Sequence, residues 1–251
     1  MLRKPLPTLV ISLDRDADRY ARLAAAFAPT PAFALQRVPG VLGSTLPAAA
    51  VAALTGGRAG HPRGALGCTL SHVMAWEMAL RSRAPWTLIL EDDAVPAGIG
   101  RLFRVELPDD ADLVMVTRRA DMLRAPPKSE PRAVALAAHA AARASLRPDA
   151  RRAPGAEGYL LSRRGARALL DAVARDGFHS FVDWRLWRYG LDAEDLSRLA
   201  DSGFAGILGK QPNGAGDAVY RGYALSPGLL KHPRGDSRRK AVDDEGAVPG
   251  G

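Results

Sequence analysis

Cysteine is almost absent from this chain. Cys68 is the single cysteine among 251 residues, which excludes an intramolecular disulfide and a cysteine-based zinc cluster. This agrees with a reducing compartment, and we interpret Cys68 as a small apolar residue rather than a nucleophile. A chain of this length buries enough apolar surface to fold without such crosslinks.

Long apolar runs are also missing. The longest, such as Ala48–Leu54 and Trp86–Leu90, fall far below the ~18 apolar residues of a membrane-spanning helix. The first residues lead into a hydrophobic run of strand length and lack the longer apolar segment and small-residue cleavage site of a signal peptide. We therefore expect a cytoplasmic protein.

Lysine is scarce, whereas arginine is abundant. The chain has five lysines and 30 arginines, with a formal net charge of +8. Much of this excess lies in residues 118–152, which hold nine basic and three acidic residues. Arginine suits the binding of phosphate and carboxylate groups. The sequence thus predicts one positively charged segment rather than a uniformly basic surface.

The order of the sequence patterns predicts an α/β fold. Apolar or β-rich runs mark strands at 7–13, 32–38, 86–90, 112–116 and 155–162, with weaker candidates at 204–208 and 218–225. Helical patterns occur at 20–27, 70–80, 163–175 and 180–189, and a Gly/Ala-rich loop is expected at 56–67. Strands that alternate with helices imply a mostly parallel, twisted sheet flanked by helices.

Two segments depart from this alternation. Residues 118–154 are rich in Arg, Ala and Pro, with one short helical stretch at 133–144 and no clear strand, so we interpret them as a variable basic insertion. Residues 233–251 are polar and end in Gly and Pro, which is typical of a disordered tail. We expect a single domain over residues 1–232.

Three consecutive carboxylates, Glu91, Asp92 and Asp93, follow the apolar strand at 86–90. A solvated acidic turn is the plain alternative. However, open α/β sheets form their ligand crevice at the carboxyl ends of strands, and adjacent like charges there repel unless a cation neutralises them. A hard divalent ion that bridges to a substrate diphosphate suits these oxygen ligands.

Four collinear blocks resemble glycosyltransferase family 25, which includes bacterial lipooligosaccharide galactosyltransferases. They are Val10–Leu13 with its basic loop, Gly64–His72, Leu88–Asp93 and Gly155–Ser162. The resemblance implies a GT-A type nucleotide-sugar-binding fold and a divalent metal, Mn²⁺ or Mg²⁺. It also implies inverting transfer of a sugar, commonly galactose, from a UDP-sugar donor.

The resemblance also implies roles for individual residues. It makes His232 a late metal-binding histidine. Because the leaving phosphates must be neutralised, we also expect Asp93 to be a direct metal ligand and Asp92 to contact metal or ribose. The donor-binding candidates are Ser12, Leu13, Arg15, Arg19, Ser71, His72, Glu91 and Asp92. The alternatives are a core histidine for His72, an ordinary loop histidine for His232 and a solvated helix start for the two arginines.

Displacement of a nucleoside diphosphate also requires a carboxylate on the opposite face, which removes the proton of the attacking hydroxyl. Asp183 is the candidate for this base, and Glu157 is its rival. A structural alternative for Asp183 is a favourable interaction with a helix dipole.

We therefore expect an inverting glycosyltransferase that moves a sugar from a UDP-sugar to a hydroxyl of a glycolipid or lipooligosaccharide precursor. The basic segment 118–152 would face an anionic acceptor or the inner face of the cytoplasmic membrane. Two alternatives remain open. One is a basic nucleic-acid-binding protein, which we do not expect because the carboxylates at 91–93 would have no purpose. The other is a family member that binds nucleotide sugar without transferring it.

Overall fold

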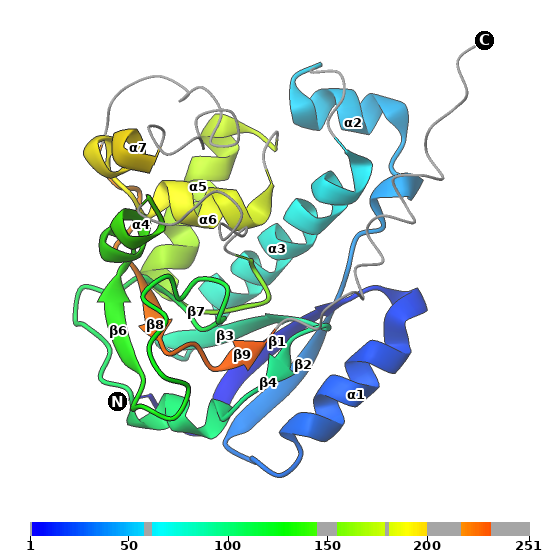
Figure 1. The fold of residues 1–251 in the computed structure, drawn as a ribbon. Coiled ribbons are helices and arrows are strands. Elements are labelled where there is room, and N and C mark those ends of the chain that lie inside the picture. The colour runs from blue at the N-terminus through cyan, green and yellow to red at the C-terminus, as the bar shows by residue number, and fades with distance from the viewer. Residues whose placement is uncertain (1, 58–61, 145–154, 179–180, 200–216, 232–251) are drawn as a thin grey trace.

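The computed structural model describes residues 2–57, 62–144, 155–178, 181–199 and 217–231. Within these residues a seven-stranded sheet has the order β2-β1-β3-β7-β5-β8-β6 (Figure 1). Its strands are β1 (Leu6–Ser12), β2 (Phe33–Pro39), β3 (Trp86–Glu91), β5 (Leu113–Met115), β6 (Arg132–Ala135), β7 (Gly158–Ser162) and β8 (Gly222–Ser226). Strands β6 and β7 run antiparallel to their neighbours, and the other strands share one direction. The predicted mostly parallel sheet with flanking helices is confirmed.

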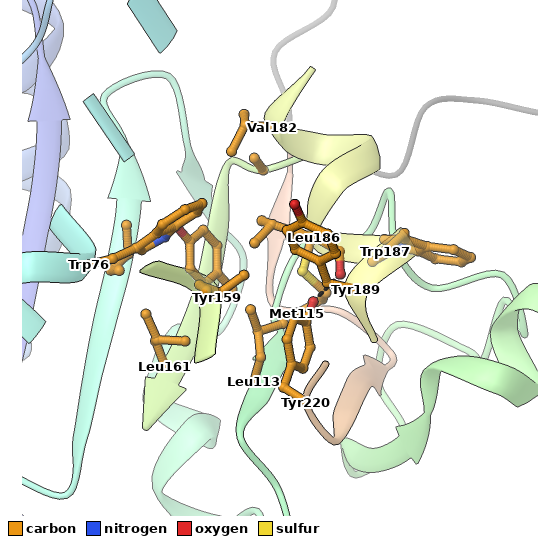
Figure 2. Packing of buried hydrophobic residues seen from close by; sticks show 14 of the residues in the cluster. Trp76, Leu113, Met115, Tyr159, Leu161, Val182, Leu186, Trp187, Tyr189 and Tyr220 are labelled. Atoms are coloured by element: carbon orange, nitrogen blue, oxygen red, sulfur yellow. Dashed lines mark hydrogen bonds between the residues drawn. The ribbon is translucent and has the colours of Figure 1, made fainter. Parts of the chain in front are cut away.

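Helices cover both faces of the sheet (Figure 1). Helix α1 (Ala17–Phe27) lies on one side, and α3 (Arg63–Arg81), α5 (Arg163–Asp176) and α6 (Val182–Tyr189) lie on the other. Because successive side chains of a strand point to opposite faces, each central strand contributes to two cores. On β5, Leu113 and Met115 pack toward α3 and α6, whereas Val114 packs toward α1. Figure 2 shows the first of these cores.

Shorter elements complete the described residues. They are η1 (Asp14–Asp16), η2 (Gly43–Thr45), α2 (Ala48–Thr55), η3 (Ile99–Arg104), α4 (Leu136–Ala144), α7 (Ala193–Leu199) and the two-stranded sheet of β4 (Val95–Pro96) and β9 (Leu230–Lys231). The predicted strand at 204–208 and the predicted tail at 233–251 lie outside the described residues. No described helix is both long and apolar enough to span a bilayer.

The prediction of a loop through residue 67 is wrong, because α3 already begins at Arg63. Gly67 is needed for close packing and not for a turn. A Cβ atom at this position would lie 2.5 Å from the carbonyl oxygen of Val41 and 2.6 Å from the backbone nitrogen of Gly43. The missing side chain lets the helix touch the backbone that follows β2.

The prediction of no strand between residues 118 and 154 is also wrong. Strand β6 pairs with β8 at the edge of the sheet, and α4 follows it directly. Edge strands that are half exposed carry little apolar signal, which explains why the pattern was missed. Arg143 on α4 is fully buried, so this segment contributes to the packed interior.

Candidate active site

The carboxyl ends of β1 and β3 lie side by side. The two strands are parallel with Ile11 opposite Glu91, and the N–H of Asp92 donates to the carbonyl of Ile11 at 3.1 Å. Ser12, at the end of β1, is buried, and its side chain counters the rise that burial causes in the pKa of Asp92. The carboxylates after β3 and Ser12 therefore lie at one edge of the sheet.

Arg19 reaches this edge from the first turn of α1. Its guanidinium lies 3.4 Å from a carboxylate oxygen of Asp92 and 3.1 Å from one of Asp93. The arginine is buried, so the alternative of a solvated helix start is wrong for this residue. Arg15, in contrast, is exposed on η1.

A fourth carboxylate comes from the segment that enters β7. Because β7 is antiparallel to β3, its start lies at the edge where β3 ends, and the N–H of Glu91 donates to the carbonyl of Glu157 at 3.0 Å. The Glu157 carboxylate, only 1% exposed, accepts a hydrogen bond from Arg119 at 3.0 Å. We call Glu91, Asp92, Asp93 and Glu157 the acidic cluster.

Burial and mutual repulsion make ionisation of the acidic cluster costly. Burial, helped by the neighbouring Glu91 charge and opposed by Arg19, raises the pKa of Asp93 to about 7. Burial also raises the pKa values of Asp92 and Glu157, although Arg19 and Arg119 respectively counter the shift. Within the part of the chain that the structure describes, four carboxylates thus lie together at this edge, and such a group is suited to a cation.

His72 and Ser71, on α3, meet the site in different ways. His72 is completely buried, with its Nε2 3.2 Å from Oε1 of Glu91 and its Nδ1 2.8 Å from the hydroxyl of Tyr159. The hydroxyl of Ser71 accepts the N–H of Val41 at 2.8 Å. This bond ties α3 to the chain after β2, so Ser71 has a structural contact that the sequence did not predict.

Cys68 lies one helical turn before His72. Its sulfur is 3.9 Å from Oε1 of Glu91, and one ligand atom each from Cys68, His72 and Glu91 lie within 4.8 Å of one another. Cys68 also packs against the core, as predicted, but it is only partly buried. Spacing along the sequence did not reveal this mixed group, because Glu91 comes from a different element.

The remaining predicted residues are not all brought to the acidic cluster. Asp183 lies in the first turn of α6, where its carboxylate accepts the N–H of Trp184 at 3.0 Å. Asp183 is not among the groups that chiefly shift the pKa values of Asp93 and Glu157. His232 lies outside the described residues.

Sequence reasoning missed Arg119 and Tyr159 as residues of the site. Arg119 belongs to the segment that was expected to face an anionic acceptor or lipid, yet its guanidinium binds Glu157. In the sequence, Tyr159 is distinguished only as one position of the strand predicted at 155–162. The one available signal was its place next to Glu157 in a block that resembles the family.

The fold and the site together define an α/β protein that gathers carboxylates where parallel strands end, the edge at which such sheets bind ligands. Residues 6–96 match the model of glycosyltransferase family 25 (LPS biosynthesis protein). This match confirms the predicted resemblance over β1 to β4, which includes Arg19, His72 and residues 91–93, and it supports a glycosyltransferase. No curated protein matches the chain.

Two solved structures resemble the whole chain at low identity. One is an active-site mutant of LgtC, which is 12% identical, covers 97% of this chain and 98% of its own, and has a TM-score of 0.39. The other is the galactosyltransferase LgtC in complex with donor and acceptor sugar analogs, which is 13% identical over the same shares and has a TM-score of 0.40. Likeness at this level identifies neither donor nor acceptor.

Proposed function

We propose that this protein is an inverting, metal-assisted glycosyltransferase of GT-A type. It transfers a sugar, galactose in the first instance, from a UDP-sugar to a hydroxyl of a cell-surface glycolipid or lipooligosaccharide precursor. The observation that carries the proposal is the acidic cluster, whose carboxylates crowd together at the ligand-binding edge of the sheet. The family match over residues 6–96 supports the reaction class.

The donor set of the acidic cluster fits a hard divalent cation. Asp93 and Asp92 offer carboxylate oxygens, the ligands that Mg²⁺ and Mn²⁺ prefer, and burial above all raises the pKa values of both groups. When bound, such an ion would neutralise the diphosphate of the leaving group. Arg19, already paired with both carboxylates, would hold them in place and add positive charge beside the phosphates.

Asp183 is our candidate for the base that accepts the proton of the attacking hydroxyl. Glu157 is buried and ion-paired to Arg119 beside Glu91, which favours a role on the donor side. A base must act from the opposite face of the sugar. Asp183 is partly exposed at the start of α6, so acceptor can reach it.

Matched amide variants test this assignment. Asp183→Asn should lower kcat by at least 10²-fold and leave the dissociation constant of UDP unchanged. Glu157→Gln should chiefly weaken UDP binding. A normal kcat in Asp183→Asn together with a large loss of kcat in Glu157→Gln would transfer the role of base to Glu157.

The donor can be identified by thermal unfolding with UDP, UDP-galactose, UDP-glucose and UDP-N-acetylhexosamines, each with and without Mn²⁺. A ligand at a hundred times its dissociation constant adds ~2.7 kcal/mol, and a domain of this size gains roughly 2–4 °C per kcal/mol. We expect stabilisation by uridine nucleotides only with metal, strongest for UDP-galactose. Stabilisation by DNA or RNA and by no nucleotide would refute the proposal.

We further propose that exposed basic residues near Leu123 bring the enzyme to anionic membrane lipid at the cytoplasmic face. Leu123, Arg124 and Lys128 are all exposed, and each basic residue near such a surface contributes ~1 kcal/mol. Deletion of the whole segment would remove β6 and α4, so charge reversal is the cleaner test. Arg124→Glu with Lys128→Glu should weaken binding to phosphatidylglycerol vesicles, whereas Arg167→Glu on α5 should not.

A further inference from the structure

Four side chains form a continuous hydrogen-bond chain from the core to the acidic cluster. The indole N–H of Trp76 donates to the hydroxyl of Tyr159 at 2.7 Å, that hydroxyl is 2.8 Å from Nδ1 of His72, and Nε2 of His72 is 3.2 Å from Glu91. Trp76, Tyr159 and His72 are completely buried, and Figure 2 shows Trp76 directed at Tyr159. We call these four side chains the Trp76–Glu91 chain.

The Trp76 end determines the direction of every hydrogen bond in this series. An indole nitrogen only donates. The Tyr159 hydroxyl, which accepts from Trp76, therefore has its own proton available for Nδ1 of His72. Nε2 then carries the imidazole proton and donates it to Glu91. In this one arrangement every donor has an acceptor, as buried polar groups require.

Burial protects this arrangement. It raises the pKa of the Tyr159 phenol well above its ordinary value, so the hydroxyl stays protonated and able to donate. The ring of Tyr159 also stacks on that of His72, with centroids 5.8 Å apart and an interplanar angle of 19°. The imidazole is thus held by a hydrogen bond at each nitrogen and by an aromatic face.

We infer that His72, Tyr159 and Trp76 are positioning residues that fix the Glu91 carboxylate against the donor site. None of them needs to touch substrate: Trp76 and Tyr159 set the tautomer of His72, and His72 orients Glu91 from its Nε2 side. The effect on nucleotide binding rests on the proposed function, whereas the tautomer of His72 follows from the hydrogen bonds of the Trp76–Glu91 chain alone. Outer hydrogen-bond partners of this kind typically change metal affinity or activity by 10–100-fold.

The nearby Cys68 suggests a competing use of the same histidine. Cys68, His72 and Glu91 present sulfur, nitrogen and oxygen atoms within 4.8 Å of one another, a set that suits Zn²⁺. Zinc would need the Nε2 lone pair of His72, and the imidazole proton would have to move to Nδ1. The Tyr159 hydroxyl would then face two donors, the indole N–H of Trp76 and Nδ1–H of His72, and its own proton would lose its acceptor. The hydrogen bonds therefore favour the Trp76–Glu91 chain over a zinc site.

Nitrogen-15 NMR of histidine-labelled full-length protein tests the tautomer without any assay of activity. We expect His72, assigned by comparison with His72→Gln, to show a protonated Nε2 and a bare Nδ1, and this pattern to persist when Zn²⁺ is added. A protonated Nδ1 would overturn the inference. So would a Zn²⁺-dependent change in the spectrum that disappears in Cys68→Ser, because only the metal site requires the thiol.

Two buried tyrosines provide a matched pair of variants. Tyr159→Phe removes the central hydroxyl of the chain, and Tyr220→Phe removes a hydroxyl of the same core that donates to the backbone of Leu186. Both should destabilise the fold. Only Tyr159→Phe should disturb the His72 tautomer and raise the dissociation constant of UDP with Mn²⁺ by at least tenfold. Equal effects of the two variants on binding would reduce Tyr159 to a structural residue.

A conservative replacement at His72 separates positioning from packing. Gln can donate to Glu91 from nearly the position of Nε2, whereas Leu cannot. We expect His72→Gln to retain UDP affinity within a few-fold and His72→Leu to lose at least tenfold. If the wild-type protein binds no uridine nucleotide, the proposed function fails, and the tautomer pattern in wild type and Tyr159→Phe still decides the inference.

Discussion

Buried carboxylates at the two ends of the central sheet differ in their hydrogen-bond and ion-pair partners. At the amino end of β5, Asp112 is a single carboxylate that receives the guanidinium of Arg164 at 2.5 Å, the N–H of Arg221 at 3.0 Å and the hydroxyl of Ser162 at 3.3 Å. At the other end, four carboxylates lie together: Arg19 pairs with Asp92 and Asp93, Arg119 pairs with Glu157, and His72 lies against Glu91. Asp112 is a single carboxylate with three donors, whereas the candidate active site gathers four carboxylates in one place.

The largest expected effect comes from Asp93→Asn compared with Asp112→Asn. Removal of the Asp93 charge should abolish stabilisation by UDP with Mn²⁺, which corresponds to a loss of at least 10²-fold in affinity. Asp112→Asn should leave that stabilisation intact, because Asp112 lies at the opposite end of the sheet. Calorimetric titration of each variant measures the difference, and equal losses of affinity would remove the distinction between the two ends.

The pH dependence of stability is the next largest effect. The pKa of Asp93 is about 7 in the folded protein against 3.8 for the ordinary carboxyl. Between these pH values the folded protein binds more protons than the unfolded chain, so the free energy of unfolding falls as the pH rises from about 4 to 7 and this contribution then levels off. The slope approaches about 1.4 kcal/mol per pH unit for one proton.

Urea unfolding at pH 5, 6, 7 and 8 measures this slope. We expect it to be clearly smaller in Asp93→Asn, although Asp92 and Glu157 contribute in the same direction because their pKa values are also raised. Without ligand and above pH 7, Asp93→Asn should be more stable than the wild type. Identical slopes in both proteins would contradict a raised pKa of Asp93 in the folded protein.

Asp112→Asn should have a smaller and opposite effect on stability. Loss of the charged acceptor weakens its bonds to Arg164, Arg221 and Ser162, and hydrogen bonds to charged groups contribute about 1.5–3 kcal/mol. The free energy of unfolding should therefore fall by about that amount at pH 7, as measured in urea. An Asp112→Asn protein that is more stable than the wild type would show that the Asp112 charge destabilises the fold.

The smallest expected effect is at the cap of α5. The Ser162 hydroxyl accepts the N–H of Gly165 at 2.9 Å, and loss of such a cap costs about 1 kcal/mol. Ser162→Ala should lower the free energy of unfolding by this amount and leave UDP binding unchanged. Ser162→Asp offers a control, since aspartate also caps helices but would place a second charge beside Asp112.

Short-range patterns predicted the central strands and most helices. The apolar runs at β1, β3 and β5 and the helical spacing of α3 and α5 are local features of the sequence. The helices α2 and α7 were missed, because an alanine-rich stretch and a short polar stretch carry little periodic signal. The antiparallel direction of β7 was beyond local reasoning, since its partners β3 and β5 are far from it in the sequence.

The candidate site was predictable only where its residues are neighbours in the chain. The triplet of residues 91–93 stood out by itself. The pairing of Arg19 with Asp92 and Asp93 joins residues more than 70 positions apart, and that of Arg119 with Glu157 depends on the entry into β7. Basic residues that the sequence assigned to the surface, such as Arg143, are buried, because charge counting does not reveal which side chains find a partner inside.

The insertion of β7 between β3 and β5 has a consequence for how the chain acquires its site during synthesis. Until residues 158–162 have emerged, β3 has no neighbour on one side, and the acidic cluster lacks Glu157. A nascent chain that ends near residue 96, the limit of the family match, would present β3 as an open edge prone to association. The amino-terminal part of the chain holds the candidate donor-binding residues, and the acidic cluster is complete only when Glu157 joins it from the later part.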